Sequence, residues 1–510
     1  MSDEILIDVG LAETRVALIE AGRLVGVSIE RPDRHSLVGA IWLGRIARVV
    51  PGMQAAFVDV GLGKAGFLAA RDARNRAAAP GRDAGSAAAV AGGDAALDEA
   101  FAGGDGAMHP SPPPIGRLVQ EGEAVLVQAI KDPLGEKGVK LTTDIALPGR
   151  LLVLTPHRPG IHLSRRLEEA AERERLAQAL VWPAGEGTGF ILRTAAAGAA
   201  ADELLAEARQ LDAAWQEIRR GADGARAPKL LWRDLDPVAR ALRDHVTKTT
   251  AGVRINTPAG LAAARAYAAA RLPELAPRIT LHTGPAPLFS LFGVEADLAQ
   301  ALEKRVGLPS GGAIAIETTQ ALTAIDVDSG SFVTGRDLDD TSCRTNLEAA
   351  SEIARQLRLR GIGGIIVIDF IHLARAADRA ALIAHFEAAL AADRAPTRVL
   401  DLSEFGLVEM TRKRTGEPLA LALSEPCGLC GGGGRLPSPA TVAADALRRT
   451  EREARAKPGR PLTLMTAPEV AAYIDGMEGA LAALEESLGV ALTLRPDPAL
   501  RREEYDVAVG

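Results

Sequence analysis

The sequence predicts a multidomain α/β protein, on three observations. The chain has 510 residues, 47% of them hydrophobic, which corresponds to about three to five domains with packed cores. Strand-like segments and helical stripes both recur along it. Residues 76–114 form a low-complexity stretch rich in Ala, Gly, Asp and Pro. This stretch buries too little side chain to offset its conformational entropy, so we expect a disordered surface insert.

The N-terminal part is predicted to consist of strands. Residues 5–9 and 14–19, with Gly22 at a turn, form a hairpin pattern. A second block contains strands at 39–50, 54–60 and 65–68, and the strand pattern resumes at 124–130 after the insert.

Helices and buried strands are predicted to dominate the remainder. A helical stretch follows Ser164 to about Leu180, and a second carries one apolar stripe that ends near Gly221. The stripe consists of Leu204, Ala208, Leu211, Trp215 and Ile218. Strands are expected at 314–317, 321–327 and 364–370, a helix at 467–488, and strands at the C-terminus.

The helix expected at residues 346–360 has the strongest local signals. Thr345 and Glu348 have the spacing of a capping box, and Gly361 follows as a stop signal.

Composition limits the function classes. The 59 Lys and Arg residues against 66 Asp and Glu give a net charge of −7, an average that argues against a nucleic-acid partner. Local charge differs: residues 131–167 carry seven cationic side chains against three carboxylates, and residues 326–340 carry five Asp against one Arg. The 3 cysteines exclude a disulfide framework and favour a reducing compartment. With no apolar run of about 18 residues, we expect a cytoplasmic protein outside the membrane.

Three aspartates form the most informative constellation. Asp326 and Asp328 alternate along one predicted strand, and Asp369 ends another. If the two strands are neighbours, their carboxylates meet and repel unless a cation holds them together. Oxygen ligands favour Mg²⁺ or Mn²⁺. The alternative is that these residues cap strand ends and face water.

Cys427 and Cys430 form a CxxC motif before a glycine run. A structural zinc needs four ligands, and Cys343 is far away in the sequence, so half a site in each of two chains indicates a zinc shared in a dimer. A redox pair or two free thiols remain alternatives, although we find no thioredoxin-like pattern around the motif.

Three further features are weak alone. Gly61-Leu62-Gly63-Lys64-Ala65-Gly66 matches GxGxxG, but a strand rather than a helix follows, so we reject a dinucleotide site. Trp42, Phe57 and Phe67 lie in this strand block and are either base-stacking or core residues. Arg193-Thr194, after an apolar strand, offers a guanidinium and a hydroxyl for a phosphate.

Ordered stretches of the chain resemble the ribonuclease E/G endoribonucleases of bacteria. The similarity extends across nearly the whole chain apart from the insert. The matching stretches are residues 54–59, 308–312, 322–328, 345–359, 363–371 and 409–414 and the CxxC motif.

The resemblance implies an order of domains. A ribonuclease H-like domain would be split between residues 1–36 and 239–301. It would be interrupted by an OB-fold RNA-binding domain at 37–142, which contains the insert, and by a 5′ sensor at 143–238. A DNase I-like catalytic domain at 302–423, a zinc link at 424–437 and a small α/β C-terminal domain at 438–510 would follow. Because the chain lacks a long tail after the CxxC motif, it resembles the shorter ribonuclease G type.

The resemblance also implies residue roles. Asp326 and Asp369, with Asp328 beside them, would form the catalytic Mg²⁺ site, and Cys427 and Cys430 would share Zn²⁺ across a homodimer. The family's commonest pattern has Asn at position 328, so Asp328 adds a negative charge. Single-stranded RNA would contact Phe57, Phe67 and Lys137. A 5′-monophosphate would be held by Gly149, Val153, Arg193 and Thr194.

The predicted function is therefore a Mg²⁺-dependent, hydrolytic endoribonuclease that prefers 5′-monophosphorylated single-stranded RNA. Its substrates would be ribosomal RNA precursors and mRNA, its products would carry 5′-phosphate and 3′-hydroxyl ends, and its dimers would remain as such or pair into tetramers. The alternative is a non-catalytic RNA-binding assembly factor in which the carboxylates are structural. A nucleotide-dependent oxidoreductase has only the rejected glycine motif in its favour.

Overall fold

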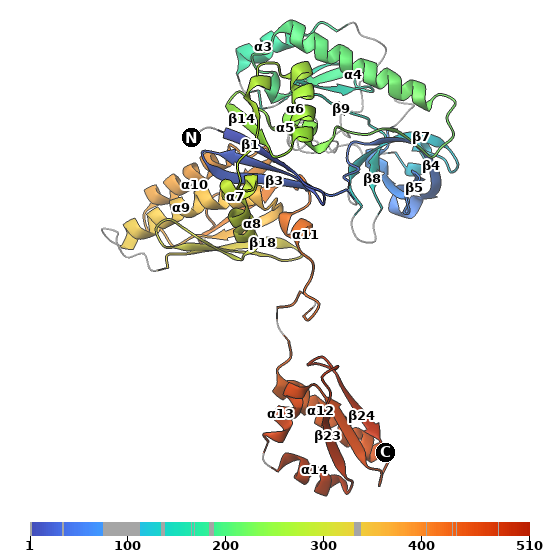
Figure 1. Ribbon diagram of the computed structural model, residues 1–510, viewed down its shortest axis with the longest axis vertical. Helices are drawn as coiled ribbons and strands as arrows, with labels where there is room; N and C mark the ends of the chain where they lie inside the picture. The colour runs from blue at the N-terminus through green and yellow to red at the C-terminus, as the bar shows by residue number, and fades with distance from the viewer. Residues whose placement is uncertain are drawn as a thin grey trace. The chain divides into compact units, whose positions relative to one another are not determined.

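The computed structural model (Figure 1) consists of two compact units, Met1–Ala422 and Leu423–Gly510. It describes residues 3–32, 35–74, 113–133, 138–164, 166–167, 169–182, 188–330, 338–403, 405–430, 432–434, 436–477 and 479–510. Both units combine helices with sheets, so the predicted α/β class is confirmed. The insert predicted at 76–114 lies outside the described residues except at its last two positions.

The first sheet joins segments that are distant in the sequence. Its strand order is β15 (Ile279–Leu281), β14 (Thr250–Ile255), β1 (Asp3–Val9), β2 (Thr14–Glu20) and β3 (Arg23–Glu30). β1 and β2 form the predicted hairpin, and β1 also pairs in parallel with β14. Buried residues of α5 (Pro237–His245) and α6 (Pro258–Arg271) share a core with this sheet.

Five strands close into a small barrel. Its strands in order are β4 (Ile41–Val50), β5 (Ala55–Asp59), β6 (Gly66–Ala69), β8 (Lys140–Thr142) and β7 (Ala124–Lys131), and β7 pairs back onto β4. β13 (Lys229–Trp232) pairs with β4 from outside the closed ring, and α2 (Ile115–Leu118) adds Ile115 to the core. Gly66, the last glycine of the GxGxxG match, begins strand β6 and not a helix, as the sequence predicts.

A four-stranded sheet with two helices follows. The strand order is β11 (Gly160–Leu163), β12 (Gly189–Leu192), β10 (Leu152–Thr155) and β9 (Leu147–Pro148). The predicted apolar stripe lies on α4 (Ala201–Ala222), where all five of its residues are buried. The helix expected after Ser164 is shorter than predicted and forms α3 (Ala170–Ala179).

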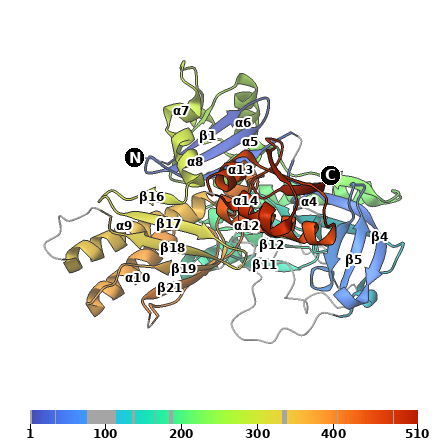
Figure 2. The ribbon, with the colours of Figure 1, turned by 90° about the horizontal axis from the view of Figure 1, so that it is seen from below.

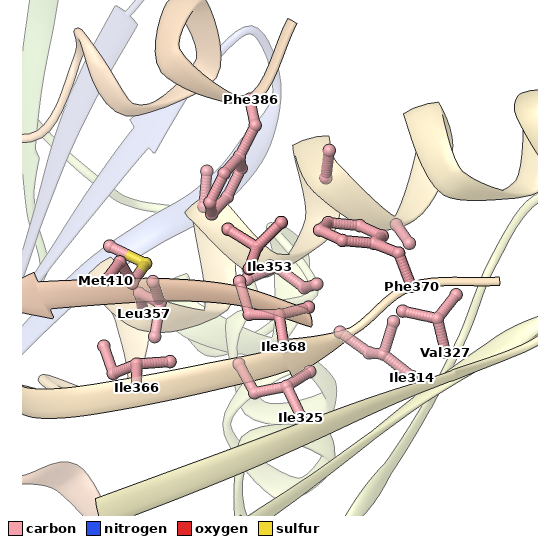
Figure 3. Packing of buried hydrophobic residues seen from close by; sticks show 14 of the residues in the cluster. Ile314, Ile325, Val327, Ile353, Leu357, Ile366, Ile368, Phe370, Phe386 and Met410 are labelled. Carbon is pink, nitrogen blue, oxygen red and sulfur yellow. The ribbon is translucent and has the colours of Figure 1, made fainter. Parts of the chain in front are cut away.

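The last sheet of the first unit has one covered face. Its strand order is β16 (Arg305–Gly307), β17 (Ala313–Thr318), β18 (Leu322–Asp328), β19 (Gly364–Asp369), β21 (Leu407–Arg412) and β20 (Thr397–Val399). Helices α9 (Leu338–Leu359) and α10 (Ala376–Leu390) cover the same face, as both views show (Figures 1 and 2). Ile325 and Ile368 point toward Ile353 in the core between strands and helices (Figure 3). Burying each such side chain contributes about 1.5–3 kcal/mol.

The start of α9 differs from the prediction. Thr345 and Glu348 do not cap the helix, because α9 already begins at Leu338. The Thr345 side chain is fully buried, and the Glu348 carboxylate instead accepts a hydrogen bond from the Ser310 N–H at 2.9 Å. The stop at Gly361 is confirmed, since this residue adopts a left-handed φ of 65° just after the helix.

The C-terminal unit is a three-stranded sheet packed with helices. The order is β23 (Leu492–Pro496), β22 (Leu462–Thr466) and β24 (Tyr505–Val509). The single helix predicted at 467–488 is wrong: Gly479, at φ 72°, separates α13 (Pro468–Asp475) from α14 (Ala480–Leu488). The prediction also missed α12 (Pro439–Ala456), although Ser438 caps it by accepting from the Thr441 N–H.

None of the helices in the described part of the chain is both long and apolar enough to cross a membrane.

Candidate active site

Asp326 and Asp369 lie side by side on the last sheet of the first unit. β18 and β19 are adjacent and parallel, and α9 lies between them in the chain. Their register pairs Asp326 directly with Asp369. The predicted meeting of these two strand ends is therefore confirmed.

Alternation along the strands places both carboxylates on the face opposite α9 and α10. Ile325, Val327 and Ile368 point into the core, so Asp326 and Asp369 between them face outward and are exposed. A hollow of about 500 Å³ lies on this open face. Its lining includes both aspartates together with Ala315, Glu317, Ala324, Ile325, Val367 and Leu407. Small alanines beside the carboxylates leave room for a ligand.

The electrostatics of this pair are unfavourable without a cation. Partial burial, and then the negative charges of Asp328 and Asp369, raise the pKa of Asp326. A cation bound between the two carboxylates would offset this repulsion. The arrangement is thus suited to binding a cation.

Asp328 has a different partner from the other two aspartates. Its carboxylate accepts a 2.8 Å hydrogen bond from the Arg305 guanidinium of β16. In the register it pairs with Ala313 of β17, two residues further along β18 than Asp326 and therefore on the same face. Its added negative charge is therefore balanced locally by Arg305.

The donor set fits a magnesium ion. Among the residues that the structure describes, no group of three or more His, Cys, Asp or Glu side chains forms a metal cage. Mg²⁺ is commonly held by only one or two carboxylates, with waters and substrate phosphates completing its shell. Asp326 and Asp369 satisfy that requirement, and zinc would need more protein ligands.

The four residues expected to hold a 5′-monophosphate lie together. Val153 of β10 pairs with Ile191 of β12, just before Arg193 and Thr194. The Arg193 guanidinium donates to the Gly149 carbonyl. An added Cβ at Gly149 would lie 2.4 Å from a carboxylate oxygen of Glu207, so a larger residue would displace this carboxylate, which accepts hydrogen bonds from the Arg150 and Leu151 N–H groups.

Arg193 and Thr194 differ strongly in exposure. Arg193 is 4% exposed and pairs with Asp244 at 3.3 Å, whereas Thr194 is exposed. Burial raises the pKa of Asp244, but Arg243 and Arg193 lower it to about 2 overall. Arg193 is thus held rigidly in a buried charge network, and Thr194 is the more accessible of the two.

The aromatic residues of the barrel divide into two kinds. Phe57 and Phe67 are paired across β5 and β6, half-buried, with ring centroids 6.1 Å apart in an edge-to-face arrangement. Trp42 is 3% exposed and belongs to the barrel core. Of these three rings, the two phenylalanines are the ones accessible for stacking on a base. Lys137 lies outside the described residues.

Cys427 and Cys430 lie in the C-terminal unit as free thiols. The backbone N–H groups of Cys430 and Leu429 lower the pKa of the exposed Cys427 thiol. The Gly434 N–H donates to the Cys430 sulfur at 3.3 Å. N–H donors around sulfur favour the thiolate, which suits both a zinc ligand and a redox pair.

Sequence reasoning missed two residues of the open face. Arg305 contacts Asp328, and Leu407 pairs with Asp369 in register. Arg305 lies three positions before the recognised stretch at 308–312, which was the one local signal for it. Leu407 likewise lies two positions before the matching stretch at 409–414, but its place on the open face depends on which strand neighbours β19.

Comparisons with known proteins give a consistent result. The model described as "Ribonuclease E/G family" matches residues 146–415, and that described as "RNase E/G, Thioredoxin-like domain" matches residues 426–509. The chain is 38% identical to "Ribonuclease G" of Escherichia coli over the full length of both, and 36% identical to "Ribonuclease G" of Haemophilus influenzae over 99% of each. It is 34% identical to "Ribonuclease E" of Escherichia coli, over 97% of this chain and 45% of that protein.

The second match corrects one expectation. It begins one residue before Cys427, so the conclusion that no thioredoxin-like pattern surrounds the CxxC motif was wrong at the level of the domain.

Proposed function

Since the chain belongs to the ribonuclease E/G family and is an endoribonuclease, we propose that it cleaves single-stranded RNA by Mg²⁺-dependent hydrolysis at Asp326 and Asp369. The observation that carries this proposal is the direct pairing of these carboxylates beside a hollow on an exposed sheet face.

In this mechanism the two aspartates would act together as ligands of the metal ion. Asp326 and Asp369 would hold the ion at the edge of the hollow, where an RNA strand can approach from solvent. A bound Mg²⁺ would lower the pKa of a water molecule and stabilise charge on the phosphoryl group. The alanine-lined floor would accommodate the scissile phosphate beside the two carboxylates. Attack by water rather than by the 2′-hydroxyl leaves 5′-phosphate and 3′-hydroxyl ends.

The remaining RNA contacts are assigned to the barrel and the four-stranded sheet. Phe57 and Phe67 would stack on bases, with Lys137 on the backbone, because an aromatic pair on a small barrel suits unpaired bases. Gly149, Val153, Arg193 and Thr194 would recognise a 5′-monophosphate. In this arrangement Arg193 orients the loop through Gly149 and Asp244, and the exposed Thr194 hydroxyl meets the phosphate.

The wider assignment follows from the same resemblance. The first sheet would be a ribonuclease H-like domain, the barrel an OB-fold, and the last sheet of the first unit a DNase I-like domain. Cys427 and Cys430 of two chains would share one Zn²⁺ and make a homodimer. We propose ribosomal RNA precursors and mRNA as substrates in the cytoplasm.

The central test is cleavage of a 5′-monophosphorylated single-stranded RNA. Asp369→Asn should remove cleavage while the protein still binds RNA, and EDTA should do the same to the unmodified chain. End analysis should show 5′-phosphate and 3′-hydroxyl products. If Asp369→Asn cleaves at the unmodified rate, the site assignment is wrong. If the unmodified chain binds RNA without cleaving it in Mg²⁺, the alternative of a non-catalytic assembly factor is favoured.

The 5′ sensor needs a separate test. Thr194→Val should reduce the preference for monophosphate over hydroxyl 5′ ends without altering the fold, because Thr194 is exposed. Arg193→Ala should reduce it further and also destabilise the chain, since it leaves Asp244 buried without one of its partners. An unchanged preference in both variants would contradict the sensor assignment.

A further inference from the structure

Arg305 lies in the same row of the open sheet face as the two paired aspartates. The register pairs Arg305 with Ala315, Ala315 with Asp326, and Asp326 with Asp369. Residues paired across adjacent strands point to the same face, so the four side chains form one line across β16, β17, β18 and β19. Strand spacing puts the Arg305 backbone about 10 Å from that of Asp326.

Ala315 lies between Arg305 and Asp326 in this row. Ala315 has only a methyl group, so nothing of its own side chain screens the Arg305 guanidinium from the hollow that Ala315 lines. The Arg305 side chain is itself exposed on this face of the sheet. A cation is thus placed beside the carboxylate pair without contacting it.

Asp328 fixes the direction of this cation. Its carboxylate is 2.8 Å from one terminal nitrogen of Arg305, and the two side chains are 60% and 47% exposed. An arginine fork has five N–H donors, so one contact leaves the others available. An ion pair this exposed contributes little to folding, so replacing Arg305 or Asp328 should leave the fold intact.

We propose that Arg305 binds a phosphate oxygen of the RNA strand next to the scissile phosphate, and that Asp328 orients its guanidinium for this contact. The inference rests on the proposed function, because it assigns the hollow to RNA. The planar guanidinium suits a phosphate better than a lysine ammonium does. The extra negative charge of Asp328 then orients a substrate-binding cation and does not enlarge the metal site.

The proposal can be tested by binding, without cleavage. Affinity of the full chain for a single-stranded oligonucleotide is measured by fluorescence anisotropy in EDTA at several salt concentrations. Arg305→Gln should lower the slope of log K against log salt by about 0.7, the value for one phosphate contact to a single strand. Arg305→Lys should retain the slope but bind less tightly, since a point charge replaces the fork.

A matched control comes from the C-terminal unit. Arg449 of α12 is also exposed and forms a 2.9 Å ion pair, with Glu453. Arg449→Gln removes an equal charge and should leave the slope unchanged. A slope that falls equally in both variants would mean that only net charge matters, and it would overturn the assignment.

Kinetics in Mg²⁺ give a second readout. Arg305→Gln should raise KM on the order of tenfold, the loss expected for one charge-assisted hydrogen bond, with a smaller change in kcat. Asp328→Asn should raise KM less, and its effect on KM should be smaller in the Arg305→Gln background, because the contact that orients the guanidinium is already absent there. Fully additive effects would overturn the orienting role of Asp328.

The failures of the two proposals are distinguishable. Cleavage that survives Asp369→Asn refutes the proposed active site, whatever Arg305 does. If Asp369→Asn is inactive and Arg305→Gln keeps both the salt slope and KM of the unmodified chain, the Arg305 assignment alone is refuted.

Discussion

Replacing Asp326 by Asn should make the metal-free protein more stable while it removes the proposed cleavage. Asp326 and Asp369 are direct neighbours in parallel strands, and Asp328 lies further along the same strand. The raised pKa of Asp326 reflects burial and these two negative charges. An asparagine has nearly the same shape but no charge, so it relieves the repulsion without leaving a cavity.

The size of the gain follows from the spacing of the strands. Paired residues on adjacent strands lie about 5 Å apart, and two unit charges at this distance repel by about 1–3 kcal/mol at effective dielectric constants of 80 to 20. Both side chains are exposed to solvent and salt, which favours the lower limit. We therefore expect Asp326→Asn to raise the free energy of unfolding by about 1 kcal/mol in EDTA.

The difference in unfolding free energy between Asp326→Asn and the unmodified chain should change sign when magnesium is present. The unmodified chain should gain about 2.7 kcal/mol at a Mg²⁺ concentration of 100 times Kd, through binding to the folded state alone. The variant lacks one of the two carboxylates and should gain much less. The two thermal unfolding midpoints should therefore cross: the variant is more stable in EDTA, and the unmodified chain is more stable in Mg²⁺.

The pH dependence gives an internal check. A carboxyl pKa raised by folding means that the folded state binds the proton more tightly, so this contribution to stability is lost as pH rises through the folded pKa. At acidic pH Asp326 of the unmodified chain becomes protonated and the repulsion is lost. The gain in unfolding free energy of Asp326→Asn over the unmodified chain should therefore shrink as pH falls. Glu217→Gln, on the exposed face of α4, serves as control and should stay within about 0.5 kcal/mol. Lower stability of Asp326→Asn in EDTA would refute the repulsion, and equal Mg²⁺ shifts would refute the metal site.

Three further predictions concern other parts of the chain. Arg412 pairs with Asp393 at 2.6 Å, and its side chain is only 4% exposed. Asp393→Ala removes this buried partner and should lower the free energy of unfolding by about 3–5 kcal/mol in urea titrations. A loss below about 1 kcal/mol would contradict this expectation. Changing Cys427 and Cys430 to Ser should yield zinc-free monomers by light scattering and elemental analysis, and an intact dimer would exclude a shared zinc. Phe57→Ala should weaken binding of a single-stranded oligonucleotide by about 1–3 kcal/mol in anisotropy titrations, and unchanged affinity would show that the ring only packs against Phe67.

Local sequence signals predicted those elements correctly that depend only on nearby residues. The hairpin of β1 and β2, the stripe of α4 and the stop at Gly361 all follow from periodicity or backbone preference. They failed once where packing outweighed a local signal and once where a glycine was overlooked. The capping signal at Thr345 was overridden because this residue is buried within a longer α9, and a glycine divides the helix predicted at 467–488.

The candidate site shows the same division. Alternation along the strand determined that Asp326 and Asp328 share a face, and the apolar run before Asp369 determined that it ends a buried strand. The sequence by itself therefore determined the α/β class, the carboxylates available for a metal and the family resemblance.

Only the tertiary structure decided which strands are neighbours. Three features depend on contacts between residues 10 to 43 positions apart: the pairing of Asp326 with Asp369, the row that includes Arg305, and the contact of Arg305 with Asp328. Hydrogen bonding between strands sets these distances, and no local preference encodes them. For this reason the sequence supplied the charged groups of the site, while the sheet decided which of them repel, which compensate one another and which face the hollow.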